Sequence, residues 1–93
     1  MALAVKDPDA RIDYGIDWGA DYVAGQSIAA SSWRVVPIEV GGLAVESASH
    51  DLLRTAVRVS GGRRGQVYQL TNHVLLSDGQ SEDRSIAIRI DDR

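Results

Sequence analysis

The sequence predicts an all-β protein, a single antiparallel β-sandwich of about seven strands. The strongest evidence lies in the last third of the chain, where residues 66–76 and 85–90 alternate polar and apolar side chains around an Asp78-Gly79 pair. An Asp-Gly pair between two alternating runs is typical of a tight β-hairpin. Turn-forming residues also recur along the chain at intervals of about ten residues, which is the pattern of a small antiparallel sandwich.

The first strand is expected at residues 11–18, where every second residue from 12 to 18 is apolar. This period of two puts the apolar side chains on one face of a strand, whereas a helix would scatter them around its axis. Residues 1–10 are expected to be an N-terminal lead-in, because Asp7-Pro8-Asp9 favours a turn just before this strand. The sandwich domain is therefore expected to span residues 11–93.

A loop is expected at residues 19–25. An extended segment at residues 26–36 follows and ends at Pro37, which cannot donate to a strand ladder. The apolar phase changes within this segment, since Ile28 and Ala30 have one parity and Trp33 and Val35 have the other. A β-bulge near residues 31–32 would let both pairs face the core.

A turn at residues 41–42 precedes a short third strand at 43–47 and a polar stretch at 46–51. Residues 50–58 fit two structures. The apolar residues 52, 53, 56 and 57 have helical spacing, while residues 53, 55, 57 and 59 alternate as in a strand. β-Branched residues dominate the end of this segment, which favours the strand. In the hairpin that follows, the even-numbered residues from Tyr68 to Leu76 are expected on one buried face.

Composition narrows the function. With 93 residues, 44% hydrophobic and 25% charged, the chain suffices for one domain and one core. It has no cysteine, so neither a disulfide nor a thiolate metal site is expected. A formal net charge of −3 and an isoelectric point near 5.1 argue against a nucleic-acid partner, whose phosphates require clustered lysine and arginine. No apolar run approaches the roughly 20 residues of a membrane span, so no membrane partner is expected either.

The reactive side chains form no catalytic or metal-binding motif. Ser49-His50-Asp51 has the residue types of a hydrolase triad, but adjacent residues cannot converge on one substrate atom. His50 and His73 lack partners at the spacing of metal ligands, and the aspartates between residues 7 and 21 lack the compact loop of a calcium site. We therefore expect no enzyme activity, no cofactor and no metal.

Two surfaces are candidates for docking a partner protein. Residues 61–65, Gly-Gly-Arg-Arg-Gly, are expected to form a flexible turn that exposes Arg63 and Arg64. These arginines are the first candidates, because the planar guanidinium pairs well with acidic groups at interfaces. The strand that begins at Asp13 is the second, since an exposed edge strand can accept a partner strand, and its polar face carries Asp13 and Asp17.

The aromatic residues are assigned to structure. Tyr68 follows a glycine-rich turn and opens an alternating run. In this position it resembles the tyrosine corner of immunoglobulin-like and fibronectin type III domains, where the ring fills the edge of the core and the hydroxyl bonds upstream backbone. The predicted sandwich is therefore of the immunoglobulin or fibronectin III kind. Trp18 and Trp33 are assigned to its core, although exposed tryptophans would instead indicate a sugar-binding platform.

Six short motifs follow one another along the chain in an order that resembles a known protein family. The motifs are KDPD at 6–9, DYGIDW at 13–18, SIAASSW at 27–33, VRVSGG at 57–62, YQLTNHV at 68–74 and EDRSI at 82–86. The chain resembles a family of small structural proteins of tailed bacteriophages and prophages, which are described as fibre-to-tail adaptors or minor virion proteins. The resemblance spans nearly the whole chain, and the departures lie mainly in residues 36–54.

The resemblance implies a non-enzymatic structural protein of the virion, an adaptor or connector at the tail, the neck or the fibre attachment site. Such a protein would be made in the bacterial cytoplasm and would bind other phage structural proteins in repeated copies within the particle. Two alternatives remain open. An accessory phage protein that binds a host protein would be missing from mature particles, and a small carbohydrate-binding module would expose Trp18 or Trp33.

Overall fold

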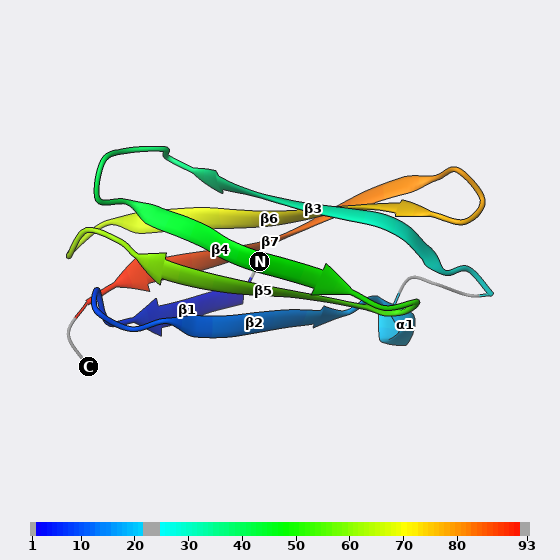
Figure 1. Cartoon of the computed structure of the whole chain (residues 1–93), viewed down its shortest axis with the longest axis horizontal. Helices are drawn as coiled ribbons and strands as arrows, with labels where there is room; N and C mark the ends of the chain where they lie inside the picture. The colour runs from blue at the N-terminus through cyan, green and yellow to red at the C-terminus, as the bar shows by residue number, and fades with distance from the viewer. Residues whose placement is uncertain (1, 22–24, 92–93) are drawn as a thin grey trace.

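A computed structural model of the protein describes residues 2–21 and 25–91. These residues form, in chain order, β1 (Ala2–Lys6), β2 (Ile12–Asp17), α1 (Trp18–Asp21), β3 (Ile28–Val36), β4 (Leu43–His50), β5 (Arg54–Gly61), β6 (Val67–Leu76) and β7 (Ser81–Ile90). Figure 1 shows the strands in two layers that follow the long axis of the molecule, with α1 near one end. The prediction of an all-β sandwich with about seven strands is confirmed at this level.

The strands form a four-stranded sheet in the order β1-β7-β6-β3 and a three-stranded sheet in the order β2-β5-β4. The predicted hairpin is the β6-β7 pair, which runs from Val67 opposite Arg89 to Leu75 opposite Ser81. The pairs within both sheets are antiparallel except β1 with β7, which are parallel. The fully antiparallel arrangement expected from the sequence is therefore wrong at this edge.

Strand β1 lies within residues 1–10, which the sequence predicts to be a lead-in. The prediction that the first strand begins after Asp9 is wrong, because Ala2–Lys6 pairs with residues 86–90 of β7. Lys6 ends this strand with a fully buried side chain, and its Nζ donates hydrogen bonds to the main-chain oxygens of Asp7 (2.8 Å) and Gly61 (2.7 Å). Strand β1 therefore forms through contacts with residues far along the chain, and not through an alternation of polar and apolar residues in its own sequence.

Residues 50–58, which fit either a helix or a strand by sequence, contain the turn from β4 to β5. The Asp51 carboxylate accepts hydrogen bonds from the main-chain N–H groups of Leu53 (2.9 Å) and Arg54 (2.8 Å). This Asx turn reverses the chain, so that β4 extends beyond residue 47 and β5 begins at Arg54. Alternate residues of β5 then face inward and are buried: Thr55, Val57 and Val59. The strand interpretation is confirmed.

The bulge in β3 lies between Ile28 and Ala30, and not near residues 31–32 as the sequence predicts. The hydroxyl of Ser31 accepts a hydrogen bond from Asn72 Nδ2 at 2.9 Å, which holds Ser31 in register opposite β6. The irregularity therefore falls two residues before the predicted segment, at the exposed Ala29.

The loop expected at residues 19–25 begins inside helix α1, so this expectation is wrong for its first residues. The N–H groups of Trp18 (3.0 Å) and Gly19 (3.2 Å) both donate to the main-chain oxygen of Leu53, which ties the start of α1 to the β4-β5 turn. Residues 22–24 of the expected loop lie outside the described residues.

The apolar core consists of two clusters between the sheets. The larger contains Val35, Leu43, Val57, Val59, Tyr68, Leu70, Ile88 and Ile90. The smaller contains Ile16, Trp18, Ile28, Val74 and Leu76. The half-buried Trp33 packs against both clusters and so joins them. Because full burial of one large apolar side chain contributes roughly 1.5 to 3 kcal/mol, these clusters supply most of the favourable free energy of folding.

A buried asparagine links the two sheets between these clusters. The Oδ1 atom of Asn72 accepts hydrogen bonds from Trp18 Nε1 (2.9 Å) and Thr55 Oγ1 (2.7 Å). Its Nδ2 atom donates to Ser31 Oγ and to the main-chain oxygen of Ser32, both at 2.9 Å. Asn72 has no exposed surface, so water cannot reach the amide end of any of these four bonds. The amide thereby connects β6 and β3 to α1 and β5.

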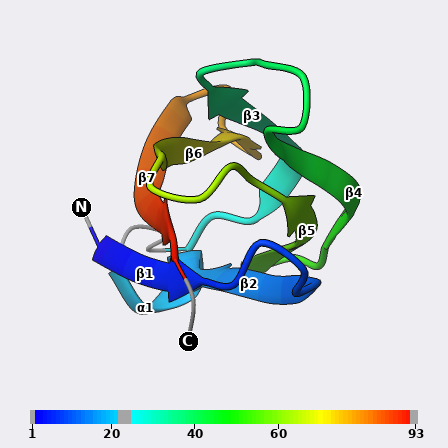
Figure 2. The same cartoon turned by 90° about the vertical axis from the view of Figure 1, so that its left-hand side faces the viewer.

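The molecule is elongated, with extents of 41 × 21 × 18 Å. The β3-β4 loop (residues 37–42) and the β5-β6 turn (residues 62–66) lie together at one end, which faces the viewer in Figure 2. We call this the Tyr68 end. The opposite end, the α1 end, carries α1, the β4-β5 turn and the β6-β7 turn (Figure 1). None of the helices in the described residues has the length and apolar character needed to cross a membrane.

Candidate docking surfaces

The Tyr68 hydroxyl joins the two loops of the Tyr68 end. Tyr68 is fully buried, and its hydroxyl accepts a hydrogen bond from the main-chain N–H of Arg63 at 3.0 Å. The same hydroxyl donates to Glu39 Oε1 at 2.5 Å. Burial and the Glu39 carboxylate raise the pKa of Tyr68, so the hydroxyl keeps its proton and remains a donor at neutral pH. One side chain therefore positions both the β3-β4 loop and the β5-β6 turn.

Close backbone contacts hold these two loops against each other. The N–H of Gly62 donates to the oxygen of Gly41 at 3.3 Å. Gly62 has a φ of 107°, and a Cβ there would lie 2.6 Å from Ile90, so only glycine fits. The buried Lys6 ammonium holds the neighbouring Gly61 oxygen from the other side, and burial lowers the pKa of Lys6. The turn is therefore fixed, and not flexible as its sequence suggests.

Two kinds of exposed side chain project from this fixed end. Arg63 and Arg64 are both exposed in the β5-β6 turn, as the sequence predicts. Ile38 and Val40 in the β3-β4 loop each expose 93% of their surface. The sequence does hold a signal for the second pair, because two large apolar residues lie between Pro37 and Gly41, where no strand alternation assigns them to the core.

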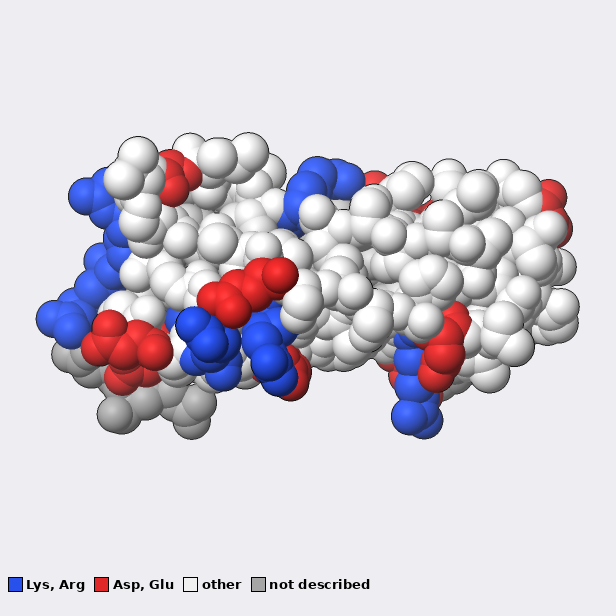
Figure 3. Space-filling view, viewed as in Figure 1, with Lys and Arg blue, Asp and Glu red and all other residues white. Residues whose placement is uncertain are grey.

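Asp13 and Asp17 lie elsewhere, on the outer face of the edge strand β2. Asp13 binds Arg58 through two hydrogen bonds of 2.8 and 3.2 Å, and Asp17 lies 3.7 Å from Arg54. The Arg58 guanidinium lowers the pKa of Asp13. Charges of both signs alternate along the lower edge of the face in Figure 3. The structure thus does not bring these aspartates together with the arginines of the Tyr68 end.

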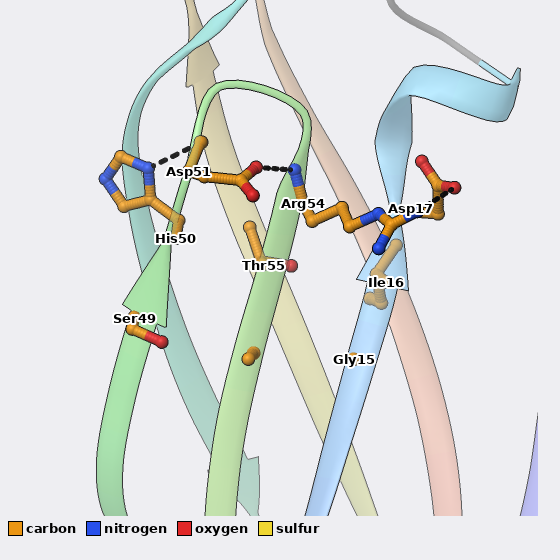
Figure 4. Close-up of a pocket in the computed structure, with 9 residues that line it drawn as sticks. Gly15, Ile16, Asp17, Ser49, His50, Asp51, Arg54 and Thr55 are labelled. Atoms are coloured by element: carbon orange, nitrogen blue, oxygen red, sulfur yellow. Dashed lines mark hydrogen bonds and ion pairs between the residues drawn. The ribbon is translucent and has the colours of Figure 1, made fainter.

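A shallow hollow between β2, β4 and β5 contains the Ser49-His50-Asp51 sequence (Figure 4). The His50 Nδ1 atom lies 3.1 Å from the main-chain oxygen of Asp51. The Asp51 carboxylate is engaged by the N–H groups of Leu53 and Arg54, which lower its pKa. The Asp51 carboxylate is therefore used in the β4-β5 turn, and the described contacts of His50 and Asp51 go to the main chain and not to one another as in a catalytic relay.

The comparison with known families decides the class of protein. Residues 6–89 match the model of the family described as "Podophage GP4 fiber-tail adaptor protein gp77". The chain belongs to this fiber-tail adaptor family. No curated protein matches the sequence significantly. The match extends from the last residue of β1 to the next-to-last residue of β7, and it confirms the phage fibre-to-tail resemblance seen in the sequence.

Family membership indicates a structural role in the virion. A fiber-tail adaptor is a structural component of the virion and binds other tail or fibre proteins of the phage. Structural adaptors are typically not enzymes. In the part of the adaptor that the structure describes, no group of three or more histidine, cysteine, aspartate or glutamate side chains is arranged to hold a metal ion.

The tryptophans of this adaptor lie in or beside its core. Trp18 has no exposed surface, and the Arg84 guanidinium lies 5.4 Å from the centre of its ring. Trp33 is half-buried between the two core clusters, and its Nε1 atom is buried without a hydrogen-bond partner among the described residues. Trp18 is therefore inaccessible as a sugar-binding surface.

Proposed function

We propose that the protein is a non-enzymatic connector of a phage particle that holds a fibre protein to a tail or neck protein by docking alone. It is made in the host cytoplasm and enters the virion in repeated copies set by the symmetry of the tail. Membership of the fiber-tail adaptor family is the observation that carries this proposal. The elongated shape supports it, because the two ends of a 41 Å molecule can contact two partners at once.

We further propose that the fold is immunoglobulin-like. In such domains one sheet contains the third, sixth and seventh strands, and the other contains the second, fourth and fifth. The sheets β1-β7-β6-β3 and β2-β5-β4 divide these six strands in the same way, while β1 pairs with β7 and not with the sheet of β2. The bond from the Arg63 N–H to the Tyr68 hydroxyl, at the start of the sixth strand, also supports a tyrosine corner. A rigid sandwich of this kind presents its end loops with little loss of entropy on binding.

The candidate residues divide between docking and structure in this proposal. Arg63 and Arg64 dock a partner, because they are exposed on a turn whose backbone is fixed. Asp13 and Asp17 hold β2 to β5 through Arg58 and Arg54, and the free side of β2 remains open to a partner strand. Tyr68 does not contact the partner itself but positions the β3-β4 loop and the β5-β6 turn for docking.

Deletion of the gene from its phage tests the proposal. Particles that lack the protein are expected to keep their tails but to lose their fibres in electron micrographs, and expression of the wild-type chain from a plasmid should restore the fibres. Deletion particles that carry a full set of fibres would refute the adaptor function. If mature wild-type particles also lacked the protein, an accessory role toward a host protein would replace it.

A further inference from the structure

The β3-β4 loop of the Tyr68 end has an inverted arrangement of polar and apolar side chains. Glu39 is half-buried and its carboxylate turns inward to the Tyr68 hydroxyl. Its two neighbours, Ile38 and Val40, each expose 93% of their surface. They are the most exposed of the large hydrophobic side chains that the structure describes. A loop normally buries its apolar residues and leaves its carboxylates in water, so this inversion calls for a physical reason.

The inversion is fixed by several bonds. Besides the bond to Tyr68, the Glu39 main-chain oxygen accepts a hydrogen bond from Gly42 N at 3.0 Å. A Cβ on Gly42 would lie 2.8 Å from Glu39 Cγ, so the loop closes tightly over its own carboxylate. Ile38 and Val40 are therefore held in water by the fold. Apolar side chains that are preorganised outward contribute nothing to folding, but they lower the entropic cost of binding.

The neighbouring turn adds charge to this apolar pair. Arg63 and Arg64 are exposed in the turn that shares the Tyr68 hydroxyl with the Glu39 loop. Figure 3 shows lysine or arginine side chains at the left edge of the molecule, next to uncharged surface and with acidic side chains above and below them. The only acidic side chain within the β3-β4 loop, Glu39, is turned inward, so the outward charge of these two described segments is positive. An apolar anchor with an adjacent arginine pair is typical of a protein-protein binding site.

We propose that Ile38 and Val40 are the anchor of the docking site and that the partner is a phage structural protein with an apolar pocket bordered by carboxylates. The two aliphatic side chains enter the pocket, and Arg63 and Arg64 pair with the carboxylates around it. This inference rests on the adaptor function proposed above and adds the chemistry of the partner surface. The α1 end remains available for the second partner.

Binding experiments with purified protein test the anchor. The probes are fibre-less particles from the deletion phage and, separately, the purified fibre. The test variant is Ile38→Ser/Val40→Ser, and the matched control is Leu52→Ser, which makes the same change at a side chain that is 68% exposed at the α1 end. All three substitutions are at exposed sites, so thermal midpoints are expected to change by no more than about 3 °C.

The wild-type protein is expected to bind both probes. The Ile38→Ser/Val40→Ser variant should lose at least about 10-fold in affinity for one probe and keep the other, as expected on truncation of a buried anchor. The Leu52→Ser variant should bind that first probe normally. Undiminished binding of both probes by Ile38→Ser/Val40→Ser would overturn the inference while the adaptor function stands. If the wild-type protein bound neither the fibre-less particles nor the purified fibre, the adaptor function would be overturned, and the inference with it.

The charge component has a separate readout. Wild-type binding to the probe affected by the anchor variant should weaken as NaCl rises from about 0.05 to 0.5 M, because the Debye length falls below 10 Å in this range. The Arg63→Glu/Arg64→Glu variant should bind weakly, and its binding should strengthen as NaCl rises, because salt screens the repulsion between the new glutamates and the partner's carboxylates. The Ile38→Ser/Val40→Ser variant should bind weakly but keep the salt dependence of the wild type. Equal salt dependence in wild type and Arg63→Glu/Arg64→Glu would remove the carboxylates from the proposed partner surface.

Discussion

Replacement of Asn72 by leucine is expected to destabilise the protein strongly, although the two side chains have similar size. Asn72 makes four hydrogen bonds in the interior, two accepted from Trp18 and Thr55 and two donated to Ser31 and Ser32. Trp18 and Thr55 are fully or almost fully buried, with exposures of 0% and 1%, so water cannot replace the lost acceptor. The Trp18 indole retains only the longer contact of 3.3 Å to Thr55 Oγ1.

The magnitude follows from these partners. An unsatisfied buried polar group costs about 1 to 3 kcal/mol, which gives about 2 to 6 kcal/mol for the indole N–H and the Thr55 hydroxyl together. The added apolar surface of leucine offsets about 1 kcal/mol or more of this, so we expect a net loss of about 3 kcal/mol. A domain of 93 residues has a total stability of roughly 5 to 14 kcal/mol. For a domain of this size, the loss corresponds to a fall in melting temperature of about 12 to 24 °C.

Urea unfolding followed by tryptophan fluorescence and circular dichroism measures this change. A matched control is Gln69→Leu, the same kind of substitution at an exposed position of the same strand, which should alter the free energy of unfolding by less than about 0.5 kcal/mol. Thr55→Val should fall between the two, because Asn72 still accepts from Trp18 in that variant. If Asn72→Leu lost less than about 1 kcal/mol, the hydrogen-bonded link between the sheets would not have the importance assigned to it.

Three further changes test the contacts of the Tyr68 end and the β4-β5 turn. Lys6→Met removes the donor of the Gly61 oxygen and should cost about 1 to 3 kcal/mol in urea unfolding, whereas a more stable variant would mean that burial of the ammonium outweighs its bonds. Tyr68→Phe should cost about 1 to 2 kcal/mol and speed amide hydrogen exchange in the loop around Glu39, and unchanged exchange would contradict the role of the hydroxyl. The pKa of Asp51 is lowered by its backbone hydrogen bonds, so its stabilising contribution is complete above pH 3.8 and is lost as the pH falls through its lower folded-state value. Asp51→Asn should therefore reduce the loss of stability between about pH 5 and 2 in acid titrations, and an identical acid profile would refute this assignment.

The parts of the fold that could be predicted are those with local signals. The alternation of β6 and β7 around Asp78-Gly79, and of β2 and β5, reflects one buried and one exposed face, which a sequence shows directly. Strand β1 has no such signal, because its pairing with β7 and the burial of Lys6 depend on residues far along the chain. The bulge in β3 was displaced from its predicted position for the same reason, since Asn72 fixes the register of Ser31.

The docking surface could be predicted only in part. Arg63 and Arg64 stand out because charged residues between glycines indicate an exposed turn. Their positioning depends on the Tyr68 hydroxyl and on its second partner Glu39, which lies 29 residues earlier in the chain. Ile38 and Val40 lie between Pro37 and Gly41, outside any strand alternation, which indicates a loop position. The extent of their exposure depends on the contact between Glu39 and Tyr68, which local sequence does not show.

Quantitative mass spectrometry of purified particles tests the central claim most directly. The protein should be present in every preparation of mature particles, at a fixed ratio to the tail proteins that matches a small multiple of the tail symmetry. The ratio should not change when particles are purified further by density gradient. Absence from mature particles, or a ratio that falls toward zero on purification, would contradict the assignment of this chain as a fibre-to-tail adaptor of the virion.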